Sequence, residues 1–323
     1  MNAPANAQST QVQAKVHVPS QIVPLRHPGR LLAAVVVLTL AASLAYSAIN
    51  NENFHWPVVR AYLFHPQIME GLRTTLILTA ASMTMAIVLG IVLASCRMSE
   101  NLVLSGLSRA YLWFFRGTPL LVQLIFWYNL SALYPRLSLS VPFGGPEIIG
   151  ATTNKVLTLW VVAIIGLTLH ESAYMAEIVR GGLLSVPKHQ SEAASALGMN
   201  RWLTFRRIVL PQALRVIVPP TGNQVIGMLK YSSLVSIIAL AELLYSAQLI
   251  YSQNFQTIPL LMVASIWYLV CTTVLSFVQS HIERYYGRGI QRGAPRPRRI
   301  AAVQALASRL SRRSRSGDVP NHA

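Results

Sequence analysis

The stretch that decides the fold is hydrophilic and lies in a very apolar chain: Glu192-Ala-Ala-Ser-Ala-Leu-Gly198-Met-Asn-Arg-Trp-Leu-Thr-Phe-Arg-Arg-Ile208-Val-Leu210-Pro211. Its residues predict a helix–turn–helix. Residues 192–197 are mostly good helix formers, and Gly198 can adopt the left-handed conformation that ends a helix. Asn200 can cap a second short helix, and Pro211 suits the first turn of the next one. Because runs long enough to span a bilayer lie on both sides, we expect this unit at a membrane surface.

The composition indicates a protein that crosses the membrane several times. Of the 323 residues, 53% are hydrophobic and only 11% are charged, whereas soluble domains have about 25% charged residues. The net charge of +17 could suggest nucleic acid, but the basic residues cluster in loops and tails, without interleaved aromatic residues. We therefore predict an all-α membrane protein with about six transmembrane helices and no nucleic-acid partner.

Apolar runs mark the expected transmembrane helices. A disordered tail at residues 1–30 precedes a helix at residues 31–49, although a cleaved signal peptide is an alternative because Ala45-Tyr46-Ser47 resembles a cleavage site. A Gly/Pro-bearing loop is expected at residues 140–154. The span near residues 213–250 is interrupted by Pro219-Pro220, Asn223, Gln224 and Lys230, and is expected to be bent or broken. The other expected spans lie near residues 74–94, 112–133, 156–176 and 258–278.

Basic residues are concentrated on one side of these spans. By the positive-inside rule, both termini and the stretch 192–211 are therefore expected in the cytoplasm. Cleavage of the first segment would instead leave about five helices and an outside N-terminus. The basic tail at residues 286–323 contains helical apolar spacing, so it could either lie on anionic lipid or remain disordered.

The spacing within the opening stretch resembles the EAA loop of permease subunits of bacterial ABC importers. In that family the loop docks into a cleft on a separate ATPase subunit. The resemblance implies that the loop, at residues 186–211, couples this chain to an ABC ATPase. The positions that match the pattern are Glu192, Ala193, Ala194, Gly198, Ile208, Leu210 and Pro211.

Further segments resemble the polar amino acid (histidine/glutamine/arginine-type) branch of these permeases. They are residues 115–123, 173–182, 219–224 and 229–236. Together with the loop, they imply an ABC importer transmembrane domain at about residues 70–285, preceded by an extra helix. Two positions depart from the pattern: His189 replaces a turn glycine, and Tyr231 stands where an aspartate is common. A glycine position with a positive φ would place strain on His189 unless the turn differs.

Enzymatic signatures are absent from the sequence. Gly222 and Gly227 have the glycine spacing of a P-loop, but Lys230 comes too late to complete it. His170 and Glu171 are adjacent, so they point about 100° apart on a helix and do not form a catalytic pair. We expect no catalytic residue, no metal site and no cofactor, with ATP hydrolysis supplied by a partner subunit.

Polar residues within the apolar runs are the candidates for a substrate path, because such groups usually face a pathway or the bundle interior. Glu171 could pair with a substrate cation, or instead form an ion pair with Arg116 or Lys230. Glu177 and Arg180 are expected to form a structural pair, and Glu242 is a further polar anchor. The candidates are Glu171, Arg116, Asn223, Gln224, Lys230, Ser232 and Ser233, with interhelical hydrogen bonding as the alternative for the uncharged ones.

The resemblance implies a permease subunit that moves polar amino acids into the cytoplasm across the bacterial inner membrane. Its expected partners are an ABC ATPase, a second identical or different permease subunit, and a periplasmic or lipid-anchored amino acid-binding protein. A permease for another small solute and a non-transporting membrane scaffold of the same fold remain the alternatives. The sequence does not identify the amino acid.

Overall fold

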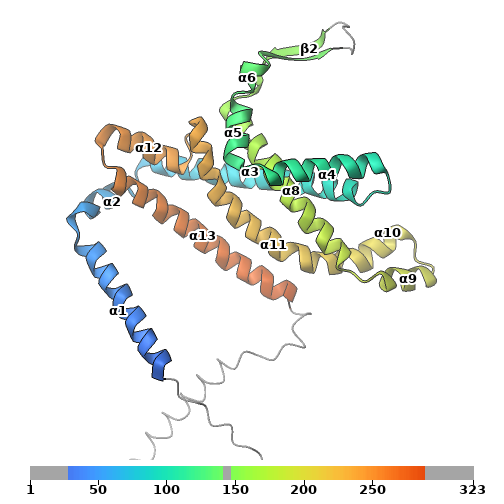
Figure 1. The fold of residues 1–323 in the computed structure, drawn as a ribbon, viewed down its shortest axis with the longest axis horizontal. Coiled ribbons are helices and arrows are strands. Elements are labelled where there is room, and N and C mark those ends of the chain that lie inside the picture. The colour runs from blue at the N-terminus through green and yellow to red at the C-terminus, as the bar shows by residue number, and fades with distance from the viewer. Residues whose placement is uncertain (1–27, 141–146, 288–323) are drawn as a thin grey trace, which may run out of the picture. The chain divides into compact units, whose positions relative to one another are not determined.

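The structure is a computed structural model that describes residues 28–140 and 147–287, and the expectations for residues 1–27 and for the tail beyond residue 287 lie outside this range (Figure 1). The chain divides into two compact units, Met1–Phe54 and His55–Ala323. In the first unit, α1 (Pro28–Asn50) precedes the short 3-10 helix η1 (Glu52–Phe54). Residues 32–50 are long and apolar enough to cross a membrane, as expected.

The second unit is almost entirely helical. Its elements, in chain order, are α2 (Trp56–Tyr62), α3 (Pro66–Arg97), α4 (Leu102–Gly117), α5 (Leu120–Tyr128), α6 (Leu130–Leu133), β1 (Arg136–Ser140), β2 (Glu147–Thr152), α7 (Thr153–Val156), α8 (Leu159–Leu184), α9 (Lys188–Ala196), α10 (Arg201–Thr204), the π-helical turn η2 (Phe205–Val209), α11 (Leu210–Tyr231), the 3-10 helix η3 (Ser232–Ile238), α12 (Leu243–Asn254) and α13 (Thr257–Gly287). Where the sequence predicts a loop at residues 140–154, β1 and β2 form an antiparallel hairpin.

Helices α3, α8 and α11 form the centre of this unit (Figure 1). Its core includes Leu124, Leu167 and Met228, which are almost completely buried. Helices α3 and α8 approach closely at Gly90, where an added Cβ would lie 2.6 Å from the Cβ of Met175. Small residues at such crossings allow the close backbone contacts that stabilise helix pairs in membranes.

The described residues contain four helices that are long and apolar enough to span a membrane, or up to five if a bent pair counts as one span. The bent pair joins residues 201–238 to residues 243–254 at an angle of 44°. The aromatic run at residues 112–133 is divided: α4 ends at Gly117, Thr118 is extended, and Pro119 caps α5. A residue that precedes proline avoids the helical conformation, which explains this break.

The expected bend of the span near residues 213–250 is confirmed, but it does not lie at Pro219-Pro220, because α11 continues through both prolines. The side-chain amide of Gln279, on α13, donates a 2.7 Å hydrogen bond to the carbonyl oxygen of Pro219. Neighbouring helices often satisfy backbone groups next to membrane prolines in this way. The chain breaks further on, at η3 and at Ala239, whose φ of 62° is left-handed.

Candidate functional site

The helix–turn–helix predicted for residues 192–211 is present. Helix α9 ends in a Schellman motif, in which Met199 N donates to Ala194 O and Gly198 N donates to Ser195 O. Gly198 has a φ of 76°, as this motif requires. The side chain of Asn200 then caps α10 by accepting a 2.8 Å hydrogen bond from Leu203 N. The expected turn and cap are both confirmed.

One face of this helix–turn–helix is open to the surroundings. Ala194 is buried, whereas Glu192 and Ala193 are exposed. Two large apolar side chains are also exposed, Leu197 at 82% and Trp202 at 68%. An exposed acid, a small exposed alanine and exposed apolar groups on one short segment suit a protein partner that approaches the backbone closely.

The segment that leads into α9 is helical and unstrained. Pro187 precedes the first turn of α9, and His189 lies within that turn. Positive φ values outside glycine occur only at His55, Ala239 and Phe255 in the described residues, so the strain considered for His189 is absent. The side-chain amide of Gln212 donates to Gln190 Oε1 and to Ile208 O, which ties this turn to the start of α11.

Two of the substrate-path candidates meet inside the second unit. The carboxyl group of Glu171, on α8, is 1% exposed and accepts a 2.7 Å hydrogen bond from Gln224 Nε2, on α11. The ion pair considered between Glu171 and Arg116 or Lys230 does not form in the described part of the chain. Glu171 is therefore a buried acid held by one amide.

The remaining candidates are dispersed. The hydroxyl groups of Ser232 and Ser233 donate to carbonyl oxygens of the preceding turn, those of Leu229 and Lys230. The side chains of Asn223 and Lys230 are exposed. Local helical hydrogen bonds thus occupy both serine hydroxyls.

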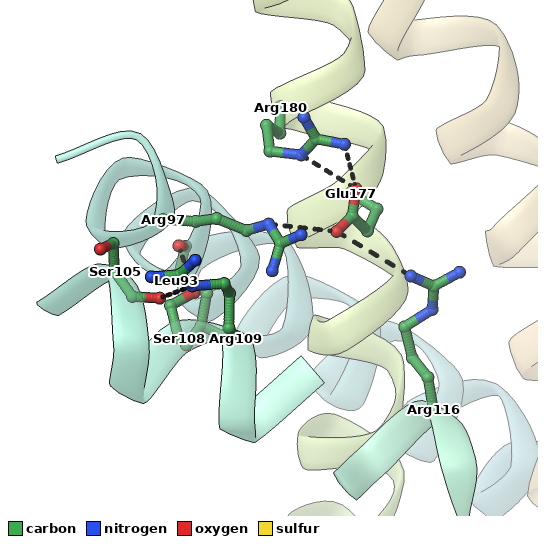
Figure 2. Close-up of polar contacts among 8 residues, drawn as sticks. All are labelled: Leu93, Arg97, Ser105, Ser108, Arg109, Arg116, Glu177 and Arg180. Atoms are coloured by element: carbon green, nitrogen blue, oxygen red, sulfur yellow. Dashed lines mark hydrogen bonds and ion pairs between the residues drawn. The ribbon is translucent and has the colours of Figure 1, made fainter. Parts of the chain in front are cut away.

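Arg116 belongs to a different cluster, which is centred on Glu177 (Figure 2). Glu177 Oε2 accepts hydrogen bonds of 3.0 Å and 2.7 Å from Arg180, so the expected pair is formed. Glu177 Oε1 also lies 3.4 Å from Arg97 Nε and 3.9 Å from Arg116 Nη1. Sequence reasoning identified the local pair but missed its two distant partners, because helical spacing carries no information about α3 or α4.

A second polar cluster surrounds Glu242, which is completely buried. Its carboxyl oxygens cap α12 by accepting from Leu244 N at 3.0 Å and Tyr245 N at 2.7 Å. The same carboxyl accepts a 2.7 Å hydrogen bond from the Tyr268 hydroxyl of α13 and contacts Thr75 of α3. Such a satisfied network indicates a structural role in joining three helices.

The described residues contain no group of three or more His, Cys, Asp or Glu side chains that could hold a metal ion.

The family model described as "Binding-protein-dependent transport system inner membrane component" matches residues 86–287. The chain belongs to this family. The match includes α8, the helix–turn–helix and α11. The helix–turn–helix and the hydrogen bond between Glu171 and Gln224 therefore both lie within the matched region. The chain is therefore an all-α membrane protein of the ABC permease type.

Individual relatives are permeases for amino acids and related compounds. The arginine transport system permease protein ArgU of Corynebacterium glutamicum is 46% identical over 276 residues, which is 85% of each chain. The glutamine transport system permease protein GlnP of Escherichia coli (strain K12) is 32% identical over 71% of this chain and 94% of its own length. The chain is thus a member of the polar amino acid branch of ABC permeases, whose curated relatives are permease subunits rather than enzymes.

Solved structures agree with this placement. A crystal structure of an amino acid ABC transporter with histidines has a TM-score of 0.58 and 33% identity, and it covers 69% of this chain and 95% of its own. An inward-facing structure of the MetNI methionine ABC transporter, at 19% identity and a TM-score of 0.54, shares the fold and covers 68% of this chain and 96% of its own.

Proposed function

We propose that this permease subunit imports polar amino acids and that residues 186–211 couple it to a separate ABC ATPase. The observation that carries the proposal is the exposure of Glu192, Leu197 and Trp202 on the helix–turn–helix. Exposed apolar side chains together with an exposed acid suit a complementary cleft on a partner. Ala193 adds a small surface over which that partner can approach.

Each pattern residue has a distinct proposed part in coupling. Glu192 contacts the ATPase, while Ala194 is packed inward and Gly198 sets the turn. Ile208, Leu210 and Pro211 join the loop to α11, because the π-helical turn runs directly into that helix. Closure of the ATPase pair would thus move α11 together with the loop.

For the substrate, we propose a cationic amino acid such as arginine. Glu171 supports this choice, because it is a buried acid without a cation partner in the described residues, and acids in membranes usually mark a functional path. Gln224 would orient the carboxyl group, and the exposed Asn223 and Lys230 lie on the same helix. The similarity to an arginine permease at 46% identity agrees with this substrate class.

The remaining candidates complete the proposed path. Arg116 would lie at the margin of the path rather than beside Glu171, because it pairs with Glu177. Ser232 and Ser233 follow α11, where the helix gives way to η3. Backbone groups at such helix breaks can bind the charged ends of an amino acid.

The proposed assembly contains two permease subunits, identical or different, two ATPase subunits and an amino acid-binding protein. Residues 70–285 would form the transmembrane domain in the bacterial inner membrane. Residues 31–49 would add a retained helix, and both tails would be cytoplasmic. The excess of basic residues in the loops on the side of residues 192–211 supports this orientation.

Charge reversal at the tip of the loop tests the coupling proposal. Glu192→Lys should abolish ATP-dependent arginine uptake into proteoliposomes and reduce the amount of ATPase that co-purifies. Glu70→Lys is the matched control, because Glu70 is an exposed acid on α3 whose only described ion pair is with Arg73. Equal uptake by the wild type and Glu192→Lys would refute the coupling role.

A backbone test complements the charge test. Gly198→Val should also prevent coupling, because a β-branched residue is strained at a φ of 76°. Membrane insertion of the variant, checked by its yield and its thermal unfolding midpoint, should persist. If the wild-type chain instead purifies without any ATPase, the scaffold interpretation would replace the importer.

A further inference from the structure

The cluster around Glu177 carries more positive charge than it can neutralise. Arg97 ends α3, Arg109 and Arg116 lie on α4, and Arg180 lies on α8. Glu177 forms ion pairs with Arg97, Arg116 and Arg180, whereas Arg109 forms no ion pair in the described part of the chain. The cluster therefore retains an excess of positive charge, arranged by three helices (Figure 2).

Two hollows open among these arginines. The first has a volume of about 410 Å³ and is lined by Arg97, Arg109 and Arg180. The second has a volume of about 440 Å³ and is lined by Arg97, Arg109 and Arg116, with the acid Glu177 also at its wall. Each hollow thus presents three guanidinium groups, which suit the tetrahedral oxygens of a phosphate group.

Arg109 is the cation best placed for such a ligand. Its residue is exposed, and its Nε donates a 3.2 Å hydrogen bond to Ser105 O, within its own helix. A guanidinium has five N–H donors, so most of those of Arg109 remain for another partner. By contrast, Arg180 already gives two hydrogen bonds to Glu177, and Arg116 lies 5.4 Å from the centre of the Tyr174 ring.

The surroundings favour a lipid as the source of the phosphate. The second hollow is also lined by Trp113, which is 78% exposed, and tryptophan is enriched at membrane–water interfaces. Elsewhere on α4, Leu102, Val103 and Leu107 are more than half exposed. An apolar helix face next to arginines suits acyl chains below a headgroup, and basic pockets between membrane helices bind anionic headgroups.

We propose that the two hollows around Arg97 and Arg109 bind the phosphate of an anionic phospholipid headgroup. The residues Arg97 and Arg109 belong neither to the helix–turn–helix nor to the proposed substrate path, although Arg116, at the edge of the second hollow, borders that path. The proposal therefore goes beyond the transport function and does not rest on it. Binding would hold the loop between α3 and α4 at the membrane surface.

The test uses the full-length chain, purified with the subunits that accompany it, and lipid binding is titrated by native mass spectrometry. A short-chain phosphatidylglycerol should bind, phosphatidylcholine should bind less, and glycerol 3-phosphate should bind much more weakly than the lipid. Arg109→Gln should weaken phosphatidylglycerol binding about tenfold, because one charge-assisted contact is lost. Arg73→Gln is the matched control, since Arg73 is an exposed arginine on α3 outside both hollows.

The thermal unfolding midpoint shows whether the Arg109→Gln variant is folded. Arg109→Lys is a second variant for the same lipid-binding titration. Lysine keeps the charge but loses the planar, forked donor geometry, so its affinity should lie between those of the wild type and Arg109→Gln. Equal binding of glycerol 3-phosphate and lipid would overturn the lipid source. Equal binding of both phospholipids, or equal losses in Arg109→Gln and Arg73→Gln, would overturn the site itself.

Discussion

Gln224 Nε2 lies 2.7 Å from Glu171 Oε1, so one hydrogen bond joins α11 to α8 at a buried acid. The acid comes from a helix packed in the centre of the unit, and the amide comes from the helix that follows the proposed coupling loop. The proposed substrate contact and the proposed ATPase contact are therefore linked through α11.

Glu171→Gln should reduce arginine uptake while leaving the fold intact. The amide keeps the shape of the side chain and can still accept from Gln224, but it cannot neutralise a substrate cation. We expect KM for arginine to rise about tenfold, with a smaller change for glutamine, in proteoliposome assays. Glu70→Gln, at an exposed position, is the control. An equal effect on both amino acids would contradict a cation-binding role.

Gln224→Leu should destabilise the protein, because it removes the described hydrogen-bond donor to a buried carboxyl. The expected loss is about 1–3 kcal/mol in unfolding by denaturing detergent. Adding Glu171→Leu should recover part of that loss, since both polar partners are then gone. Strictly additive losses in the double variant would show that the two side chains are not coupled.

Glu242→Ala should be among the most destabilising single changes at an acid in this chain. It removes the cap of α12 and leaves the hydroxyl group of Tyr268 without its described acceptor. We expect a loss of about 2–4 kcal/mol in the same unfolding assay. Glu242→Gln keeps one acceptor oxygen and should lose less, and a wild-type stability for Glu242→Ala would disprove the structural assignment.

Gly90→Ala tests the crossing of α3 and α8. The Cβ atom of the new alanine would lie 2.6 Å from Met175 Cβ and 3.1 Å from Ala176 N, so the helices must separate. Such overpacking costs about 1–3 kcal/mol. Gly106→Ala is a matched control on α4, where no atom lies within 4 Å of the added Cβ. That control should be neutral or stabilising, because alanine favours helix, and a similar loss in both variants would argue against a close crossing.

Local rules account for the parts of this structure that the sequence predicts well. Gly198 and Asn200 act within a few residues of themselves, so the turn and the cap can be read from the chain. The break at Thr118-Pro119 follows the same kind of rule, but the apolar run around it concealed the signal. The hairpin of β1 and β2 was missed because its strands are short and interrupt an otherwise helical pattern.

Long-range contacts account for most of what could not be predicted. Arg97 and Glu177 are 80 positions apart in the sequence and meet only because α3 packs on α8. The partner of Glu171 could equally have been Arg116 or Lys230 on sequence grounds, and the packing of α11 selects Gln224 instead. The hydrogen bond that Pro219 O accepts from Gln279 also comes from another helix, so the sequence does not reveal it.

The continuity of α10, η2 and α11 has a mechanical consequence. From Arg201 to Tyr231 the chain is continuously helical, and this segment is about 45 Å long at 1.5 Å per residue. The proline pair lies near the middle of this helix, where Gln279 donates a hydrogen bond to Pro219 O. Gln224 lies in the following turn. A displacement of Trp202 at one end would therefore be transmitted along this helix past the proline pair. Such a displacement would change the hydrogen bond between Gln224 and Glu171.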